Sequence, residues 1–124
     1  IDENNAILSS MEEFDAQNYK FSPVKYRGDL TPKGRQAHSA VALDKYNMII
    51  IGGSYSLSLI DPQPIPADDM VYIYDMDAST WKKLSMKSSH QSDPAPWNLV
   101  HHTSFKLNTQ NICILWYDLV EKEQ

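Results

Sequence analysis

Four short apolar runs between Arg35 and Leu84 constrain the fold of this chain most strongly. They are rich in β-branched or aromatic residues, and turn residues bound each of them. None continues with helical spacing over about ten positions. The runs are Ser39–Leu43, Met48–Ile51, Met70–Tyr74 and Thr80–Leu84. This pattern predicts four strands and an all-β fold.

The connections between these runs predict how the strands are ordered. Asp44–Asn47 joins the first run to the second, and Asp75–Ser79 joins the third to the fourth. Both are short and rich in Asp, Asn or Ser, which suits hairpin turns between antiparallel strands. The second and third runs are joined by a long segment with several prolines, Ser54–Asp69. We therefore expect a four-stranded antiparallel meander.

The same stretch carries an ordered set of residues that resembles the kelch repeat. Arg35 and His38 precede the first run, Ile49–Gly53 ends the second, and Trp81 follows Tyr74 by seven residues. In the kelch family one repeat forms one blade of a β-propeller. The resemblance implies an all-β, kelch-type propeller built from four-stranded meanders, with the tryptophan as a buried anchor of the fourth strand.

Internal repetition extends this pattern to both sides of the central stretch. Two flanking segments align on it without a gap: residues 14–24 on 74–84, and residues 102–115 on 38–51. The first alignment places Phe14 on Tyr74 and Phe21 on Trp81. The second places a histidine on a histidine and an apolar strand on an apolar strand. The flanks are therefore expected to be parts of further blades.

The repeats divide the chain into five predicted parts. In order, these are a frayed end (1–10), the last two strands of one blade with an inter-blade loop (11–34), a complete blade (35–84), an inter-blade loop (85–100), and the first two strands of a further blade (101–124). The propeller is thus expected to be incomplete. Because a repeat cannot bury its apolar face alone, the remaining blades should come from the same polypeptide or an associated chain.

Composition narrows the class of partner and the compartment. The net charge of −5 argues against nucleic acid, whose phosphates require clustered Lys and Arg. No apolar run approaches the ~20 residues of a membrane span. Cys113 is the only cysteine, so no internal disulfide can form, and there is no Asn-x-Ser/Thr sequon. We expect an intracellular protein, cytoplasmic or nuclear, that binds neither nucleic acid nor membrane.

The residues that could carry metal or nucleophilic chemistry have structural explanations. A zinc site needs three or four converging ligands, and the repeat already accounts for His38 and His102 as equivalent positions. Cys113 aligns on Ile49 in an apolar strand, which predicts a buried, inert thiol. Gly52–Gly53 lacks the Lys-Ser/Thr of a phosphate-binding loop and instead permits a bulge or a close backbone approach. We predict no catalytic residue, no metal and no cofactor.

Two further candidates have plain structural alternatives. Arg35 could bind a ligand carboxylate, whereas the kelch resemblance implies a structural arginine. Arg27-Gly28-Asp29 could suggest an integrin ligand, but it is also typical of a turn between blades. Kelch-like copper oxidases need a tyrosine cross-linked to a cysteine. A cysteine predicted in a core strand gives that interpretation no support, so we do not expect an enzyme.

The lengths of the connections point to a binding face. In an antiparallel meander successive connections alternate between two ends, so the long ones, Tyr26–Gly34, Ser54–Asp69 and Ser85–Val100, should share one end. Variable function usually resides in long loops on a rigid scaffold. The expected partner contacts are Tyr55, Leu57, Leu59, Ile60, Ile65 and Trp97. Alternatively, these apolar loop residues cover the ends of neighbouring blades.

The kelch resemblance leads to an expected function and two alternatives. The expected function is a protein–protein interaction module that presents loops to a protein partner. The first alternative is a structural subunit of a large multi-protein assembly. The second is the propeller domain of an enzyme whose catalytic residues lie outside these 124 residues.

Overall fold

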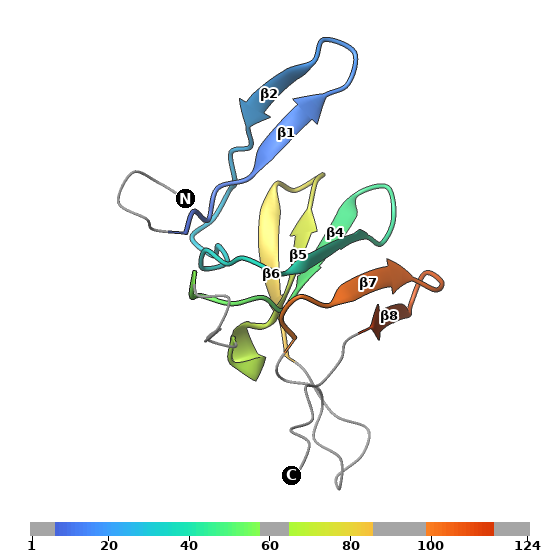
Figure 1. Ribbon diagram of the computed structural model, residues 1–124. Coiled ribbons are helices and arrows are strands. Elements are labelled where there is room, and N and C mark those ends of the chain that lie inside the picture. The colour runs from blue at the N-terminus through green and yellow to red at the C-terminus, as the bar shows by residue number, and fades with distance from the viewer. Residues whose placement is uncertain (1–6, 58–64, 86–98, 116–124) are drawn as a thin grey trace, which may run out of the picture.

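Three antiparallel sheets make up the computed structural model, which describes residues 7–57, 65–85 and 99–115 (Figure 1). The strands are β1 (Glu12–Asp15), β2 (Lys20–Pro23), β3 (Ser39–Ala42), β4 (Asn47–Ile51), β5 (Val71–Asp75), β6 (Thr80–Leu84), β7 (Thr103–Lys106) and β8 (Ile112–Leu115). A 3-10 helix, η1 (Ala67–Asp69), precedes β5. The sheet orders are β1-β2, β3-β4-β5-β6 and β7-β8. The predicted all-β class is confirmed, and none of the described sheets closes on itself.

The central sheet, β3 to β6, is apolar on both faces because β4 is apolar at nearly every position. Strand side chains alternate between faces, so consecutive residues of β4 are buried in different clusters. One cluster contains Ile50, Tyr72, Tyr74 and Trp81. The other contains Ile49, Ile51, Met70, Val71 and Leu99. A strand covered on both sides accounts for the continuous apolar run seen in the sequence.

Trp81 is the aromatic anchor of the first of these clusters, as predicted. Its side chain is only 7% exposed. Its ring centroid lies 5.0 Å from that of Tyr74, its register partner on β5, and 6.0 Å from that of Tyr26. Tilted and edge-to-face ring pairs at these distances add stabilisation beyond the area they bury.

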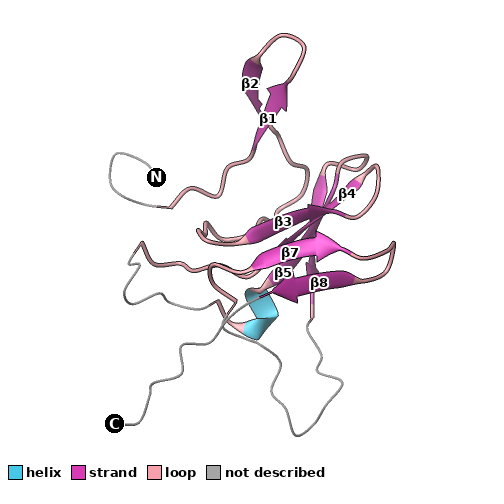
Figure 2. Ribbon diagram, turned by 45° about the vertical axis from the view of Figure 1, so that its right-hand side comes forward, coloured by secondary structure: helices cyan, strands magenta, loops and turns pink. Residues whose placement is uncertain are grey.

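The β7–β8 hairpin packs on the second cluster of the central sheet (Figure 2). Ile112 and Ile114 of β8 contact that cluster. At the neighbouring strand ends, Ser39 Oγ lies 2.6 Å from Ser104 Oγ and 2.7 Å from His102 Nε2. Ser39 therefore meets the two residues that flank its own repeat equivalent, Thr103. The β7–β8 sheet is therefore packed on the central sheet with equivalent residues nearly opposite each other.

The β1–β2 hairpin is placed differently and projects beyond the central sheet (Figure 1). Its base contacts the sheet through Met11, Val24 and Tyr26, which pack against the cluster around Trp81. The rest extends away, so Phe14 is 50% and Phe21 70% exposed, although their rings pack on each other at 4.9 Å. Their repeat equivalents are buried, whereas nothing in the described part of the chain covers this aromatic pair.

Each flanking hairpin has the same strand register as the equivalent hairpin of the central sheet. Phe14 pairs with Phe21 as Tyr74 pairs with Trp81. Likewise, β7 pairs with β8 as β3 pairs with β4, since Thr103 opposes Leu115 and Ser39 opposes Ile51. The two sequence alignments therefore correspond to equivalent hairpins. The second strand of the first hairpin ends at Pro23, and the Val24 N–H after it still donates to the Met11 carbonyl at 2.9 Å.

The four short turns share one capping device. In each, an Asp or Asn side-chain oxygen accepts hydrogen bonds from the backbone N–H groups two and three residues later. The four capping residues are Asp15, Asp44, Asp75 and Asn108. For Asp44 the distances to the two nitrogens are 2.8 and 3.0 Å. Each turn is thus stabilised by its own first residue.

Candidate binding platform

The long connections meet at one end of the central sheet, where backbone hydrogen bonds join each to the other two. They span residues 24–38, 52–70 and 85–102, of which 58–64 and 86–98 lie outside the described residues. Gln36 and Ser54 exchange both backbone bonds, at 3.0 and 2.8 Å. Gly53 N–H donates to Leu99 at 2.7 Å, and His101 N–H donates to Ala37 at 3.1 Å. We call this hydrogen-bonded end the platform.

Gly52 and Gly53 allow the three connections to approach this closely. Both have positive φ, 68° and 104°, which residues with a Cβ rarely adopt. A Cβ on Gly52 would collide with the Leu99 carbonyl oxygen, and one on Gly53 would lie 2.6 Å from the Gln36 carbonyl oxygen. The close backbone approach expected from the double glycine is confirmed.

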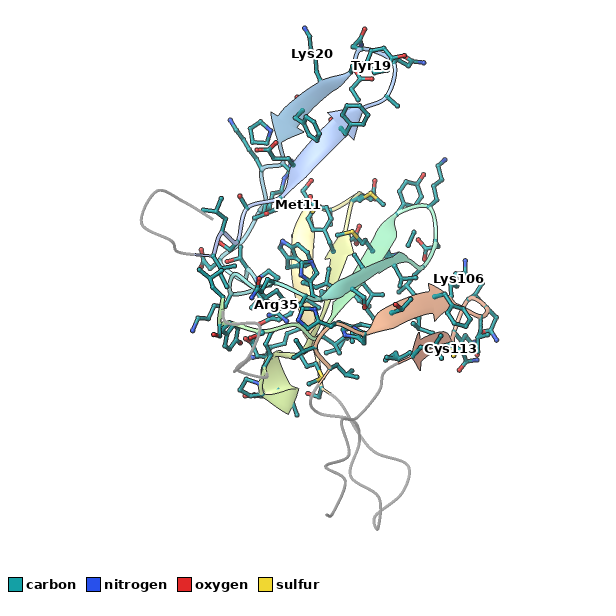
Figure 3. The ribbon with its side chains drawn as sticks, in the orientation of Figure 1. Met11, Tyr19, Lys20, Arg35, Lys106 and Cys113 are labelled. Carbon is teal, nitrogen blue, oxygen red and sulfur yellow. The ribbon has the colours of Figure 1, made fainter. Side chains whose placement is uncertain are left out.

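Arg35 is a buried residue whose side chain links parts of the platform by hydrogen bonds (Figure 3). It is 7% exposed, and its Nη1 donates to the carbonyls of Gly52 at 3.3 Å and Met70 at 3.4 Å. Nη2 lies 3.7 Å from Asp69 Oδ2. Burial lowers the pKa of Arg35, and the Asp69 carboxylate opposes that shift. Because the guanidinium serves its own chain, the geometry supports the structural role over carboxylate capture.

Tyr72 and Asp69 complete the charged layer beneath the platform. The Tyr72 hydroxyl donates to Asp69 Oδ1, and Lys83 Nζ lies 3.9 Å from the same oxygen. Burial, reinforced by this hydrogen bond and the carboxylate charge, raises the pKa of Tyr72 to about 12. The phenol therefore remains protonated at neutral pH and acts as a hydrogen-bond donor.

The predicted partner contacts divide into three groups. Tyr55 and Leu57 lie on the platform; Tyr55 is half-buried and Leu57 is 37% exposed. Ile65 is 2% exposed, so it is a core residue and not an available contact. Its burial agrees with the alternative that apolar loop residues cover the sheet ends. The remaining three, Leu59, Ile60 and Trp97, fall outside the described residues.

Lys33 is a platform residue that sequence reasoning missed. Its Nζ lies 4.3 Å from the centroid of the Tyr55 ring, a cation–π geometry. The lysine side chain is exposed and belongs to a different long connection from the tyrosine. No local pattern marks such a pair, since only the folded loops bring the two residues together.

Two other sequence expectations need revision. Cys113 lies on β8 as predicted but is half-buried and not fully buried (Figure 3). The equivalent histidines also differ. His102 is 7% exposed and bonded to Ser39, whereas the residue surface of His38 is exposed.

Comparisons with known proteins give no family for this chain, so its function is inferred from the geometry of the platform. Among the described residues, no group of three or more His, Cys, Asp or Glu side chains is placed to hold a metal ion. None of the helices in that part of the chain is long and apolar enough to cross a membrane. No protein-family model matches the chain, and no curated protein matches it.

Proposed function

We propose that this chain is a protein–protein interaction module, part of a kelch-type propeller, and that the platform binds a protein partner. One observation carries the proposal: each long connection is hydrogen-bonded to both of the others. The described residues of these loops are held in place by those bonds, so they lose little conformational entropy when a partner binds. Long loops on a rigid scaffold are also where binding function usually resides.

The surface chemistry of the platform suggests what it binds. Tyr55 and Leu57 provide aromatic and aliphatic contact area, and Lys33 places a positive charge over the tyrosine ring. Aromatic residues are enriched among the few that dominate binding energy at interfaces. The proposed ligand is therefore a protein segment with an apolar side chain beside a carboxylate.

Packing of the sheets supports the propeller part of the proposal. Propeller blades are four-stranded sheets arranged around a central axis. The central sheet has four strands in meander order, and β7–β8 stacks against it with equivalent residues side by side. The single cysteine and the absence of a glycosylation sequon fit the proposed cytoplasmic or nuclear location of a non-enzymatic module.

Site-specific photocrosslinking tests the binding face directly. A photoreactive phenylalanine analogue would replace Leu57 on the platform and, as a matched control, Tyr46 in a short turn at the other end. Both positions are exposed, at 37% and 47%. In extracts from the native host, the Leu57 probe should give discrete protein adducts that the Tyr46 probe does not give. Adding Lys33→Glu should reduce those adducts about 10-fold, a loss of ~1.4 kcal/mol in binding.

Two results would contradict the platform assignment. One is adduct formation from Tyr46 equal to that from Leu57. The other is identical adducts with and without Lys33→Glu. Thermal melts of each variant serve as a control, because these substitutions lie on exposed side chains and should leave stability within about 0.5 kcal/mol.

A further inference from the structure

In the described chain β1 and β8 each have one free edge, and these two strands are equivalent to two strands that pair with each other in the central sheet. By the repeat, β8 corresponds to β4 and β1 corresponds to β5. In the central sheet β4 and β5 are hydrogen-bonded neighbours. In the described chain β8 pairs only with β7, and β1 pairs only with β2. Each strand therefore has one edge without a partner strand in the described chain, and its equivalent shows which strand would fit.

We propose that copies of this chain assemble head to tail, with β8 of one copy pairing antiparallel with β1 of the next. The joined hairpins would form a sheet in the order β7-β8-β1-β2, equivalent to β3-β4-β5-β6. This proposal goes beyond partner binding at the platform and does not depend on it. The contact is heterologous, because different strands of the two copies meet.

The charge distribution of the strands favours this pairing over pairing at β2 or β6 and over pairing of two β1 strands. β8 contains no charged residue and no proline. Two of the outer strands carry the residues that normally protect an edge: β2 has Lys20 and Pro23, and β6 has Lys82 and Lys83. Two β1 strands would bring their Glu12-Glu13 pairs together, which like-charge repulsion opposes. An uncharged β8 edge imposes no such repulsion.

The exposed apolar side chains of both hairpins fit the same arrangement. Phe14 and Phe21 would take the positions that Tyr74 and Trp81 hold in the central sheet, where both are buried. The incoming β7–β8 hairpin presents Phe105, which is 42% exposed.

A cavity lies where that hairpin would sit. It has a volume of about 520 Å³, between the β1–β2 hairpin and the β3–β4 edge of the central sheet. Its apolar lining includes Met11, Val24, Ala40, Ala42 and Met48, and the charged residues on its rim are Glu12, Glu13 and Lys25. One assembly step thus covers exposed apolar surface on both copies.

The repeat specifies the register between copies, and the native cysteine can report it. Ile49 opposes Ile73 in the central sheet, so Cys113 should oppose Glu13 of the next copy. Opposed residues of antiparallel strands have Cα atoms ~4.5–5.5 Å apart, within the range of a disulfide. Glu12 is the matched control, because it lies on the same strand but points to the opposite face.

The test is oxidative crosslinking of full chains carrying Glu13→Cys or Glu12→Cys, in an equal mixture of ¹⁵N-labelled and unlabelled protein. Glu13→Cys should give disulfide-linked peptides that join the substituted position to Cys113, with at least 10-fold more crosslink than Glu12→Cys. About half of these peptides should contain one labelled and one unlabelled partner, which identifies pairing between copies. Circular dichroism of both variants confirms that the edge substitutions leave the strands intact.

Three outcomes would overturn the proposal. Equal crosslinking by the two variants would mean random collision. Cys113–Cys113 dimers in the unmodified chain would mean that β8 pairs with itself. A chain that sediments as a monomer at every concentration tested, without crosslinks, would mean that neither edge pairs.

Sedimentation of the unmodified chain should instead show mass rising with concentration to about two to four copies. The described residues of each copy supply two blades' worth of strands, and propellers contain ~4–8 blades. None of these readouts involves the platform, so failure here is distinguishable from failure of partner binding.

Discussion

Ala37 and His101 occupy equivalent positions of the repeat, have nearly the same left-handed backbone conformation, and are hydrogen-bonded to each other. Their φ angles are 56° and 57°, and His101 N–H donates to the Ala37 carbonyl at 3.1 Å. A second equivalent pair, Tyr19 and Ser79, has φ of 56° and 57°. The repeat therefore extends to unusual backbone conformations, including one that joins neighbouring repeats at the platform.

Replacing Ala37 with glycine should stabilise the chain. An L-residue in the left-handed region costs ~1–2 kcal/mol, and glycine avoids that cost while losing more entropy on folding. We expect a net gain of about 0.5–1 kcal/mol in urea melts. Ala40→Gly on β3, which has ordinary strand geometry, should instead cost about 0.5–1 kcal/mol. Destabilisation by both substitutions would contradict the strain at Ala37.

Trp81→Ala should cost about 3–5 kcal/mol in the free energy of unfolding, because it removes a large buried aromatic ring. Phe21→Ala is the control at the equivalent repeat position. At protein concentrations where the chain is monomeric, it should cost less than about 1 kcal/mol, since the phenylalanine is 70% exposed. Denaturant melts of both variants measure the difference. Equal losses would mean that the hairpin packs as tightly as the central sheet.

Gly52→Ala should destabilise more than Gly28→Ala, although both glycines have positive φ, 68° and 81°. A Cβ on Gly28 meets nothing within 4 Å, so that substitution reports the conformational cost alone, ~1–2 kcal/mol. At Gly52 the added methyl group also collides with the Leu99 backbone. We expect the loss there to exceed the Gly28 loss by at least about 1 kcal/mol. Similar losses in urea melts would mean that the connections can separate without cost.

Stability should fall as the pH drops below about 6.5 because of His102. Burial lowers the pKa of His102 from its ordinary 6.5. Between the two pKa values the unfolded chain binds more protons than the folded one. Proton binding therefore lowers the free energy of the unfolded chain, and the free energy of unfolding decreases. The contribution of neutral His102 to the free energy of unfolding is therefore complete above pH 6.5. It is lost as the pH falls through the lower pKa of the folded state.

Urea melts at about pH 7.5 and about pH 5.5 measure this effect. His102→Gln can keep a hydrogen bond to Ser39 but cannot titrate, so it should reduce the stability difference between the two pH values. If His102→Gln left the difference between the two pH values unchanged, the buried histidine would not be its source.

Local sequence signals predicted the strands and turns well, but they did not predict which surfaces are covered. The apolar run at Met48–Ile51 and the Asp-rich turns place the central strands within a residue or two, since these signals depend on neighbouring residues. The burial of Ile65 and the partial burial of Cys113 depend instead on which distant segments cover them. The projection of the β1–β2 hairpin has the same origin: its repeat equivalent has a described strand beside it in the central sheet, and it does not.

The capped turns also determine the order in which this chain can fold. Each hairpin contains its own turn signal, so each can form locally within ~1–10 μs, before any distant contact is made. The platform cannot, because it requires three connections from well-separated parts of the chain to close together. We therefore expect the slow step of folding to be the closure of the three connections and not the formation of the hairpins. Changes at Gly52 should therefore slow the arrival of the native state, while the hairpins still form at their own rate.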